Sequence, residues 1–279
     1  MTRRLSEMVV LITGASAGIG AALAEQLHAA GAKLVLTARR LDRLEALNAR
    51  LGGQHLVLQA DVSKTEDCQA ITDQAWEHFG RLDTVVANAG YGLYEPVALT
   101  TPQATRAIFA TNVFGTTDLI HAAAPYLLQQ SPRDGWRGQI MIVSSAVGRR
   151  GVPFLGTYSG TKAAQLAIAE SLRVELEPVR IAVTSVHPIM TKTDFGSTAE
   201  GHGTLVLPRT ESRTMVQTVD HVARRMVEAI ERPKPEVWPS WPARVLFGLG
   251  TLFPSLMDRG MGRYRDQVIE LNPQLPANP

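Results

Sequence analysis

A tyrosine and a lysine, Tyr158 and Lys162, stand four residues apart in the sequence. On a helix this spacing places two side chains on one face, one turn apart. A phenol ordinarily loses its proton at about pH 10, too high for ready proton exchange near neutrality. Because a neighbouring ammonium favours the phenolate, Lys162 is expected to lower the pKa of Tyr158 into a range useful for acid–base catalysis. This spacing alone more often marks an ordinary surface pair, so its meaning depends on the rest of the chain.

Two other polar residues are weaker candidates for the same site. Ser145 follows the apolar run 139–143, which is typical of a strand, and precedes Tyr158 by thirteen residues. Paired serines at the end of a strand are usually turn residues. Asn112 lies inside a helical pattern, where a lone asparagine is more often a satisfied polar residue than a catalytic one.

The elements that must position these side chains begin with an apolar run and a glycine turn. Residues 8–12 read as a strand buried on both faces, and Gly14, Gly18 and Gly20 follow it before a helical pattern over 21–30. A strand, a glycine turn and a helix place free backbone N–H groups where a pyrophosphate is stabilised. The glycines permit the tight turn and a close approach of ligand and strand. A nucleotide site is therefore favoured over a plain turn and helix cap.

The end of the second expected strand, 33–37, indicates which nucleotide binds. A cofactor with a free ribose 2′-hydroxyl usually meets an acidic residue at this strand end. Here Arg39 and Arg40 follow the strand, and the first acid is Asp42. Because a guanidinium binds a phosphate in bidentate fashion, the sequence predicts NADP(H), with Arg39 as the main ligand of the 2′-phosphate and Arg40 as its helper. The alternative is that both arginines merely open the helix expected over 41–51.

The third and fourth expected strands also end in residues suited to a ligand. Strand 55–59 leads to Asp61, which either caps the next helix, expected over 70–79, or accepts a hydrogen bond from an adenine amino group. Strand 82–87 leads to a small polar segment, 88–90, and small residues at this end of a strand suit a backbone that passes close to a ligand.

Together these residues resemble the short-chain dehydrogenase/reductase family, in its compact single-domain branch. The resemblance covers residues 7 to about 237, and the ordered set of motifs carries it rather than any single one. It implies an α/β fold, a three-layer doubly wound Rossmann parallel sheet of about seven strands, and hydride transfer between nicotinamide and an alcohol or carbonyl. The set consists of Gly14, Gly18, Gly20, Asp61, Asn88, Ala89, Gly90, Asn112, Ser145, Tyr158 and Lys162.

The resemblance also implies a role for each candidate residue. Tyr158 is the general acid in reduction and the base in oxidation, and Ser145 hydrogen-bonds the substrate oxygen. Lys162 binds the ribose hydroxyls of the nicotinamide half and lowers the phenol pKa, while Asn112 holds a water in the proton relay. Two hydroxyl donors suit a carbonyl that develops oxyanion character as it accepts hydride. The residues expected to contact NADP(H) are Gly14, Ser16, Ala17, Gly18, Ile19, Gly20, Arg39, Arg40, Asp61, Val62, Asn88, Ala89, Gly90, Tyr158, Lys162, Pro188, Ile189, Thr191 and Thr193.

Two positions depart from the family pattern. Ala87 stands where the family usually has the first of two asparagines, which is a mild change. Ile189 stands where a glycine commonly follows the proline, and its β-branched side chain restricts how the backbone approaches the nicotinamide amide. His187, just before this proline, is expected to be a buried residue at the end of a strand rather than a substrate contact.

The chain is expected to form one domain over 1–279, in which 1–239 is the core. Residues 190–213 are polar and glycine-containing, and they occupy the place of the substrate lid in the family. Residues 240–279 form an apolar helical extension, interrupted by Pro254, that begins near Trp238 and Trp241. This extension is expected to cover the core or the substrate mouth, to form a subunit contact, or to lie in a membrane interface. Each role favours a hydrophobic substrate.

Composition excludes several other classes of protein. A net charge of +2 over 279 residues, with scattered basic side chains, gives no nucleic-acid surface. Cys68 is the only cysteine, so the chain has no internal disulfide, and no Cys/His cluster predicts a metal site. No run of eighteen apolar residues is present, and the apolar run near the N-terminus is too short for a signal peptide. A cytoplasmic protein is expected, with membrane association left to the C-terminal extension.

The sequence therefore predicts an NADP(H)-dependent oxidoreductase that acts on a lipophilic carbonyl or secondary alcohol. One alternative is a membrane-surface lipid or sterol keto-reductase anchored by the extension. Another is a non-catalytic redox sensor that binds NADP(H), which the presence of Ser145 and Tyr158 beside Lys162 disfavours. The family resemblance implies a homodimer or a homotetramer.

Overall fold

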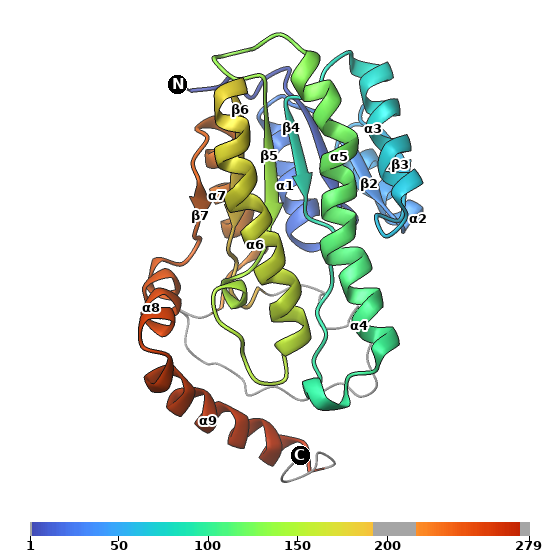
Figure 1. Ribbon diagram of the computed structural model, residues 1–279. Helices are drawn as coiled ribbons and strands as arrows, with labels where there is room; N and C mark the ends of the chain where they lie inside the picture. The colour runs from blue at the N-terminus through green and yellow to red at the C-terminus, as the bar shows by residue number, and fades with distance from the viewer. Residues whose placement is uncertain (1, 192–215, 274–279) are drawn as a thin grey trace.

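The computed structural model describes residues 2–191 and 216–273 and has three layers, with a parallel sheet between two layers of helices (Figure 1). The sheet in this described part has seven strands in the order β3-β2-β1-β4-β5-β6-β7. The chain builds outward from β1 to β3 and then returns to the other side of β1 at β4. In such sheets a ligand binds where the order reverses, at the carboxyl ends of the strands. The expected doubly wound fold is confirmed.

The strands are β1 Val9–Thr13, β2 Lys33–Ala38, β3 Leu56–Gln59, β4 Thr84–Ala87, β5 Gly138–Val143, β6 Ile181–Val186 and β7 Glu236–Val237. The helices are α1 Gly18–Ala29, α2 Leu41–Arg50, α3 Thr65–Phe79, α4 Pro102–Phe109, α5 Gly115–Gln129, α6 Gly156–Leu176, α7 Val219–Glu231, α8 Trp241–Leu252 and α9 Pro254–Leu271. The largest differences from expectation are helix starts: α1 begins at Gly18 rather than 21, and α3 at Thr65 rather than 70. The first turn of α1 contains two glycines and that of α3 mostly polar residues, so neither gives a clear apolar periodicity.

The helices divide between the two faces of the sheet. Helices α1, α2 and α7 pack on one face through side chains such as Leu23, Leu44 and Met226. Helices α3, α5 and α6 pack on the other through Ile71, Leu119 and Ala169. Because both faces are covered, every residue of β1 and β6 is buried, which explains their continuous apolar or small side chains.

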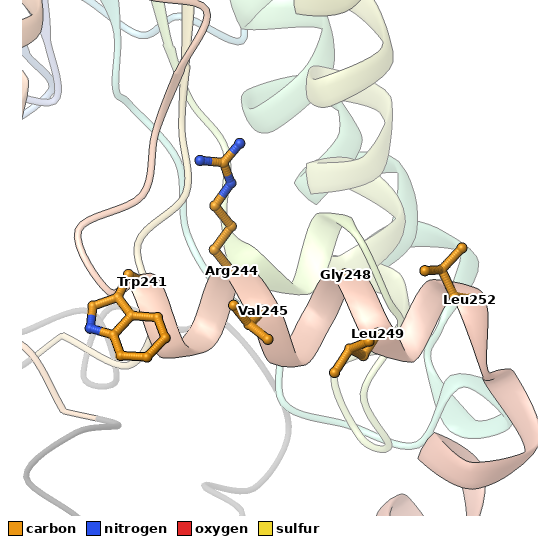
Figure 2. Close-up of a pocket in the computed structure, with 6 residues that line it drawn as sticks. All are labelled: Trp241, Arg244, Val245, Gly248, Leu249 and Leu252. Atoms are coloured by element: carbon orange, nitrogen blue, oxygen red, sulfur yellow. The ribbon is translucent and has the colours of Figure 1, made fainter.

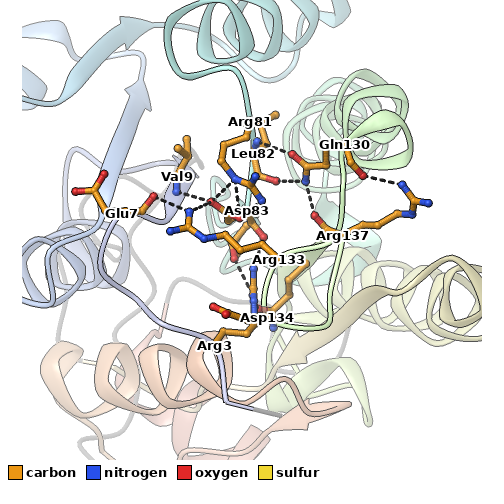
Figure 3. Close-up of polar contacts among 12 residues, drawn as sticks. Arg3, Glu7, Val9, Arg81, Leu82, Asp83, Gln130, Arg133, Asp134 and Arg137 are labelled. Carbon is orange, nitrogen blue, oxygen red and sulfur yellow. Dashed lines mark hydrogen bonds and ion pairs between the residues drawn. The ribbon is translucent and has the colours of Figure 1, made fainter.

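A buried polar cluster ties the N-terminal segment to the amino ends of the central strands (Figure 3). The guanidinium of Arg3, whose residue is 2% exposed, donates to the carbonyl of Asp83 at 2.7 Å and to Gln139 Oε1 at 2.9 Å. The Asp83 carboxylate accepts from the backbone N–H of Val9 at 2.9 Å and pairs with Arg81 at 2.7 Å. Burial lowers the pKa of Arg3 to about 10. The cluster lies at the opposite end of the sheet from the carboxyl edge, so its contribution is to stability.

Helices α8 and α9 extend beyond the carboxyl edge of the sheet (Figure 1). The inner side of α8 packs through Ala243 and Phe247 against Ala146, and Ile189 joins the same cluster. Helix α9 is held by an ion pair between Asp258 and Arg150. Within the described ranges, no helix combines the length and apolar character that crossing a bilayer requires.

Candidate active site

The glycine turn between β1 and α1 is packed closely against the end of β4. Gly14 has a φ of +68° and Gly18 a φ of +57°, conformations that other residues rarely adopt. A Cβ added to Gly20 would lie 2.4 Å from the carbonyl oxygen of Gly14. The side chain of Asn88 donates to the carbonyls of Thr13 at 2.8 Å and Gly14 at 3.3 Å. The amide of Asn88 therefore fixes the turn, and the glycines leave its backbone open to a ligand.

The start of α1 suits an anionic group. Its N-cap residue is Ala17, whose methyl side chain accepts no hydrogen bond, and the first turn, which includes Ile19, has no acidic residue. The N–H groups of a first turn attract negative charge when no side chain satisfies them. The absence of a side chain at Gly20 leaves space beside the turn, and the start of α1 has no side-chain cap. Together these two features fit the pyrophosphate of a dinucleotide.

The two arginines after β2 lie differently. Arg40 is partly buried, and its guanidinium donates to Ser16 Oγ in the glycine turn at 3.1 Å. Arg39 is exposed, and its carbonyl accepts from Gln59 Nε2 at 2.9 Å. Arg40 is also the N-cap residue of α2, without a side-chain cap. The structure thus places Arg40, expected only as the helper, directly against the turn, while the assignment of the 2′-phosphate stays a prediction.

Asp61 forms a local turn after β3. Its Oδ1 accepts from the backbone N–H of Ser63 at 3.0 Å and from its hydroxyl at 2.8 Å. Helix α3 begins at Thr65 after the N-cap residue Lys64, so the helix-capping alternative for Asp61 is wrong. The neighbouring Val62 is buried against Gly115, where an added Cβ would meet the Val62 carbonyl at 2.6 Å.

Ser145, Tyr158 and Lys162 come together at the carboxyl edge of the sheet. Ser145 follows β5, and its hydroxyl donates to the carbonyl of Pro188 at 3.2 Å. Helix α6 presents Tyr158 and Lys162 one turn apart, with Lys162 Nζ 5.6 Å from the centre of the Tyr158 ring. Nζ donates to the carbonyl of Val143, the last residue of β5, at 2.9 Å. The end of β5 and helix α6 therefore position all three side chains.

The expected lowering of the Tyr158 pKa by Lys162 is wrong for this structure. Burial raises the pKa of Tyr158 above its ordinary value, the nearby Tyr94 raises it further, and a hydrogen bond with Ser145 opposes the rise. Burial also lowers the pKa of Lys162 to about 7. Desolvation is the largest cause of the Tyr158 shift, and it outweighs the charge effect expected of Lys162.

Asn112 lies in a single π-helical turn, 110–114, between α4 and α5, and is fully buried. Its Oδ1 accepts from the backbone N–H of Tyr91, and its Nδ2 donates to the Tyr91 carbonyl and to Thr161 Oγ1, each at 3.0 Å. A Cβ added to Gly90 would lie 2.9 Å from Asn112 Oδ1 and 3.6 Å from Lys162 Nζ. The side chain of Asn112 thus joins the segment after β4 to α6, and its expected role toward a water stays a prediction.

The segment after β6 lies beside Ser145, on the remaining side of the candidate site. Pro188 and Ile189 lie beside Ser145 and α8, and the Ile189 N–H donates to Gln217 Oε1 at 3.3 Å. The apolar contact with α8 accounts for an isoleucine where a glycine is common. Thr191 Oγ1 donates to the Ile189 carbonyl at 2.8 Å. Thr193 and most of the expected lid, 192–213, lie outside the described residues.

His187 is fully buried, as expected, and it stacks on Trp238 with ring centres 4.4 Å apart. Burial lowers its pKa to about 4. Among the described residues no group of three or more His, Cys, Asp or Glu side chains is placed to hold a metal ion.

Three site residues escaped the sequence analysis. Gln165 contacts Lys162, and its only signal was a polar residue in an apolar stretch of α6. Tyr94 and Tyr264 are partly buried tyrosines whose pKa values are raised by desolvation. Tyr94 is near enough to act on the pKa of both Tyr158 and Tyr264. Tyr264 belongs to α9 and lies near Tyr94. The C-terminal extension therefore approaches the catalytic side of the molecule, and covering of the substrate mouth stays one of its three expected roles.

The outer side of α8 carries an apolar groove, shown in Figure 2. Trp241 and Leu252 are 74% and 72% exposed, and Val245 and Leu249 lie between them. Arg244 also lines the groove. Exposed apolar stripes of this kind are uncommon on monomeric soluble proteins and mark contact surfaces.

Comparisons with known proteins agree with this geometry. The short chain dehydrogenase profile matches residues 8–202. An 11-beta-hydroxysteroid dehydrogenase 1A of Arabidopsis thaliana is 35% identical over 266 residues, covering 90% of this chain and 74% of that protein. Among solved structures, a short chain dehydrogenase/reductase from Burkholderia phymatum in complex with NAD has a TM-score of 0.80 at 23% identity, over 91% of this chain and 96% of that one. An alcohol dehydrogenase from Thermococcus sibiricus complexed with 5-hydroxy-NADP has a TM-score of 0.71 at 27% identity, over 83% of this chain and 95% of that one.

Proposed function

Since the chain belongs to the short chain dehydrogenase/reductase family, we propose that it is an NADP(H)-dependent oxidoreductase that interconverts a lipophilic ketone and its secondary alcohol. The observation that carries this proposal is the grouping of Ser145, Tyr158 and Lys162 at one edge of the sheet. The glycine turn between β1 and α1 lies at the same edge.

The residues of the glycine turn between β1 and α1 fit a dinucleotide. Gly14, Gly18 and Gly20 leave room for a pyrophosphate at the start of α1, and Asn88 holds the turn in place. When bound, the nicotinamide supplies the hydride for reduction or takes it up in oxidation. Lys162 and the segment 188–191 would bind the nicotinamide half, with Lys162 donating to ribose hydroxyls.

Tyr158 supplies the proton. Because burial raises the pKa of its phenol, the hydroxyl stays protonated at neutral pH, which is the form that a general acid needs for ketone reduction. Tyr158 donates its proton to the ketone oxygen as that oxygen becomes an alkoxide, and Ser145 stabilises the same oxygen with a hydrogen bond. The Ser145 hydroxyl lies within reach of the phenol, and their hydrogen bond lowers the phenol pKa toward the range required for proton transfer.

Arg39 and Arg40 would select NADP(H). Arg40 and Ser16 form one polar contact beside the glycine turn, and Arg39 is free to reach a phosphate from the exposed side. Both guanidinium groups suit a 2′-phosphate, whereas a carboxylate would repel it.

Titration with NADPH and NADH, followed by energy transfer from protein to nicotinamide fluorescence, tests this selection. We expect wild-type protein to bind NADPH at least tenfold more tightly, and Arg39→Ala and Arg40→Ala each to weaken NADPH alone. Arg50→Ala, at the far end of α2 in an exposed pair with Glu25, is the matched control. An NADPH preference that survives both substitutions would refute the assignment.

A lipophilic substrate is supported by the relatives and by the surroundings of Tyr158. The Arabidopsis thaliana relative is named for a hydroxysteroid. In this chain Tyr94 lies near the catalytic tyrosine, Tyr264 lies near Tyr94, and α8 contributes apolar side chains beside Ala146. A screen of steroid and long-chain ketones against small polar ketones checks the class, and faster turnover of the polar set would contradict it.

Reaction at a membrane surface is the second candidate, favoured by the exposed stripe on α8. Sedimentation with anionic vesicles tests it, with Trp241→Gln combined with Leu249→Gln as the variant. Loss of vesicle binding in the variant would support an interfacial enzyme, and no binding by wild type would exclude it. A homodimer or homotetramer is proposed from the family, and the molar mass in solution measures it. A non-catalytic NADP(H) sensor would bind the cofactor and turn over no ketone.

A further inference from the structure

A glutamine lies fully buried on α6 in the turn after Lys162. Gln165 has no exposed surface, although Ala163, Ala164 and Leu166 around it are small or apolar. Burying an amide is unfavourable unless its donors and acceptor find partners. The partners of Gln165 therefore indicate why an amide occupies this position.

Gln165 connects Lys162 to the π-helical turn that contains Asn112. Its Oε1 accepts from Lys162 Nζ at 2.9 Å. Its Nε2 donates to the backbone carbonyl of Asn112 at 2.7 Å and to Thr116 Oγ1 at 2.8 Å. These contacts join α6 to residues about fifty positions earlier in the chain.

The orientation of this amide follows from the chemistry of its neighbours. A backbone carbonyl only accepts hydrogen bonds, so the NH₂ group must face Asn112. An ammonium only donates, so the amide oxygen must face Lys162. Both requirements are met by one orientation, and the flipped amide would satisfy neither.

The Asn112 carbonyl already has a second side-chain donor. Thr116 Oγ1 donates to it at 2.8 Å, so with Gln165 it accepts two side-chain hydrogen bonds. A carbonyl oxygen has two lone pairs. In this chain the Gln165 side chain connects the Asn112 carbonyl to Lys162.

The same contacts fix the direction of the lysine head group. An ammonium has three N–H bonds, and those of Lys162 include one to the Val143 carbonyl and one to Gln165 Oε1, each at 2.9 Å. Two fixed directions of a tetrahedral nitrogen determine the third. Removing Gln165 would leave Lys162 held by Val143 alone and free to turn about that bond.

We propose that Gln165 is a positioning residue for Lys162, and that its amide links the Asn112 carbonyl to the lysine ammonium. The proposal rests on the proposed function for its catalytic consequence, but the link itself is a property of the folded chain. Its effect reaches the substrate only through Lys162.

Three variants test the link. Gln165→Leu removes both halves of the amide at similar volume, and Gln165→Glu keeps an acceptor for Lys162 while losing the donor to Asn112. Gln139→Leu is the matched control, because Gln139 is also fully buried and makes three hydrogen bonds, to Thr184, Ala229 and Arg3, far from the site.

The first readout is the pH dependence of unfolding of the protein without cofactor. The unfolded chain keeps the lysine proton to higher pH than the folded one, so stability rises with pH between the two pKa values. We expect Gln165→Leu to move the start of this rise to lower pH and Gln165→Glu to move it to higher pH. Gln139→Leu should lower stability without changing the pH at which the rise begins. If stability rises over the same pH range in wild type and in both Gln165 variants, the link is overturned.

The second readout is turnover of the best ketone with NADPH. We expect Gln165→Leu to lower kcat at least tenfold with the ketone KM within threefold of wild type, and Gln165→Glu to recover part of the loss. A kcat for Gln165→Leu equal to that of Gln139→Leu would overturn the catalytic role. Wild-type protein that turns over no ketone would instead refute the proposed function, and the unfolding readout would still decide the link.

Discussion

Substitution of Gly20 by alanine tests the close packing on which cofactor binding depends. Gly20 lies in the first turn of α1, and an added Cβ would be 2.4 Å from the Gly14 carbonyl oxygen and 2.7 Å from Asn88 Nδ2. Both neighbours are held in place, because Asn88 hydrogen-bonds the same turn. The methyl group can therefore fit only if the start of α1 moves away from the turn.

The size of the effect follows from these distances. An ordinary carbon–oxygen contact begins near 3.4 Å, so the start of α1 must move by about 1 Å. Overpacking of this kind costs about 1–3 kcal/mol, partly offset by the helix preference of alanine over glycine, about 1 kcal/mol. A displacement of about 1 Å in a positioned group lowers function by about 100-fold. We expect Gly20→Ala to weaken NADPH binding by at least tenfold, with a smaller loss of stability.

The assay is NADPH titration together with urea unfolding. Gly262→Ala is the matched control, because Gly262 is also helical, in α9, and an added Cβ there meets nothing within 4 Å. That variant should keep its NADPH affinity and gain stability, by up to about 1 kcal/mol. Unchanged affinity and stability in Gly20→Ala would refute the packing argument.

Two further predictions concern stability. Asp83→Asn removes the buried charge that pairs with Arg81 and one of the two oxygens that accept from Arg81 and the Val9 N–H. Urea unfolding should therefore show a loss of about 3 kcal/mol. The same change at Asp266, in an exposed pair with Arg265, should cost less than about 1 kcal/mol. Equal losses would contradict the burial argument. The second prediction concerns Lys162, whose pKa in the folded state is lowered to about 7. Because the unfolded state binds more protons between pH 7 and 10, the stability of wild type relative to Lys162→Met should rise by about 2 kcal/mol from pH 7 to 9. A constant difference in the free energy of unfolding would show that Lys162 stays charged.

The sequence predicted the parts of the site that depend on local patterns. The glycine turn, the strand before it and the four-residue spacing of Tyr158 and Lys162 are each contained in one short segment, and the structure places them as expected. The doubly wound parallel sheet of about seven strands followed from the family resemblance, and it is confirmed.

Features that depend on distant contacts could not be predicted. The pKa of Tyr158 is set by burial among elements that include Tyr94, and burial outweighs the lysine that the local spacing emphasised. Gln165 finds its partners on the π-helical turn and α5, and Ile189 finds them on α8. A polar residue in an apolar helical stretch was the one local sign of the Gln165 contact.

The proposal that Tyr158 is the proton donor in a nicotinamide-dependent reduction is tested most directly by Tyr158→Phe. Phenylalanine keeps the ring and removes only the hydroxyl, so NADPH affinity measured by fluorescence transfer should stay within threefold of wild type. Turnover of the best ketone should fall by at least about 100-fold, in the range expected for loss of a general acid. Turnover within a few-fold of wild type, at unchanged NADPH affinity, would contradict the assignment of Tyr158 as the acid.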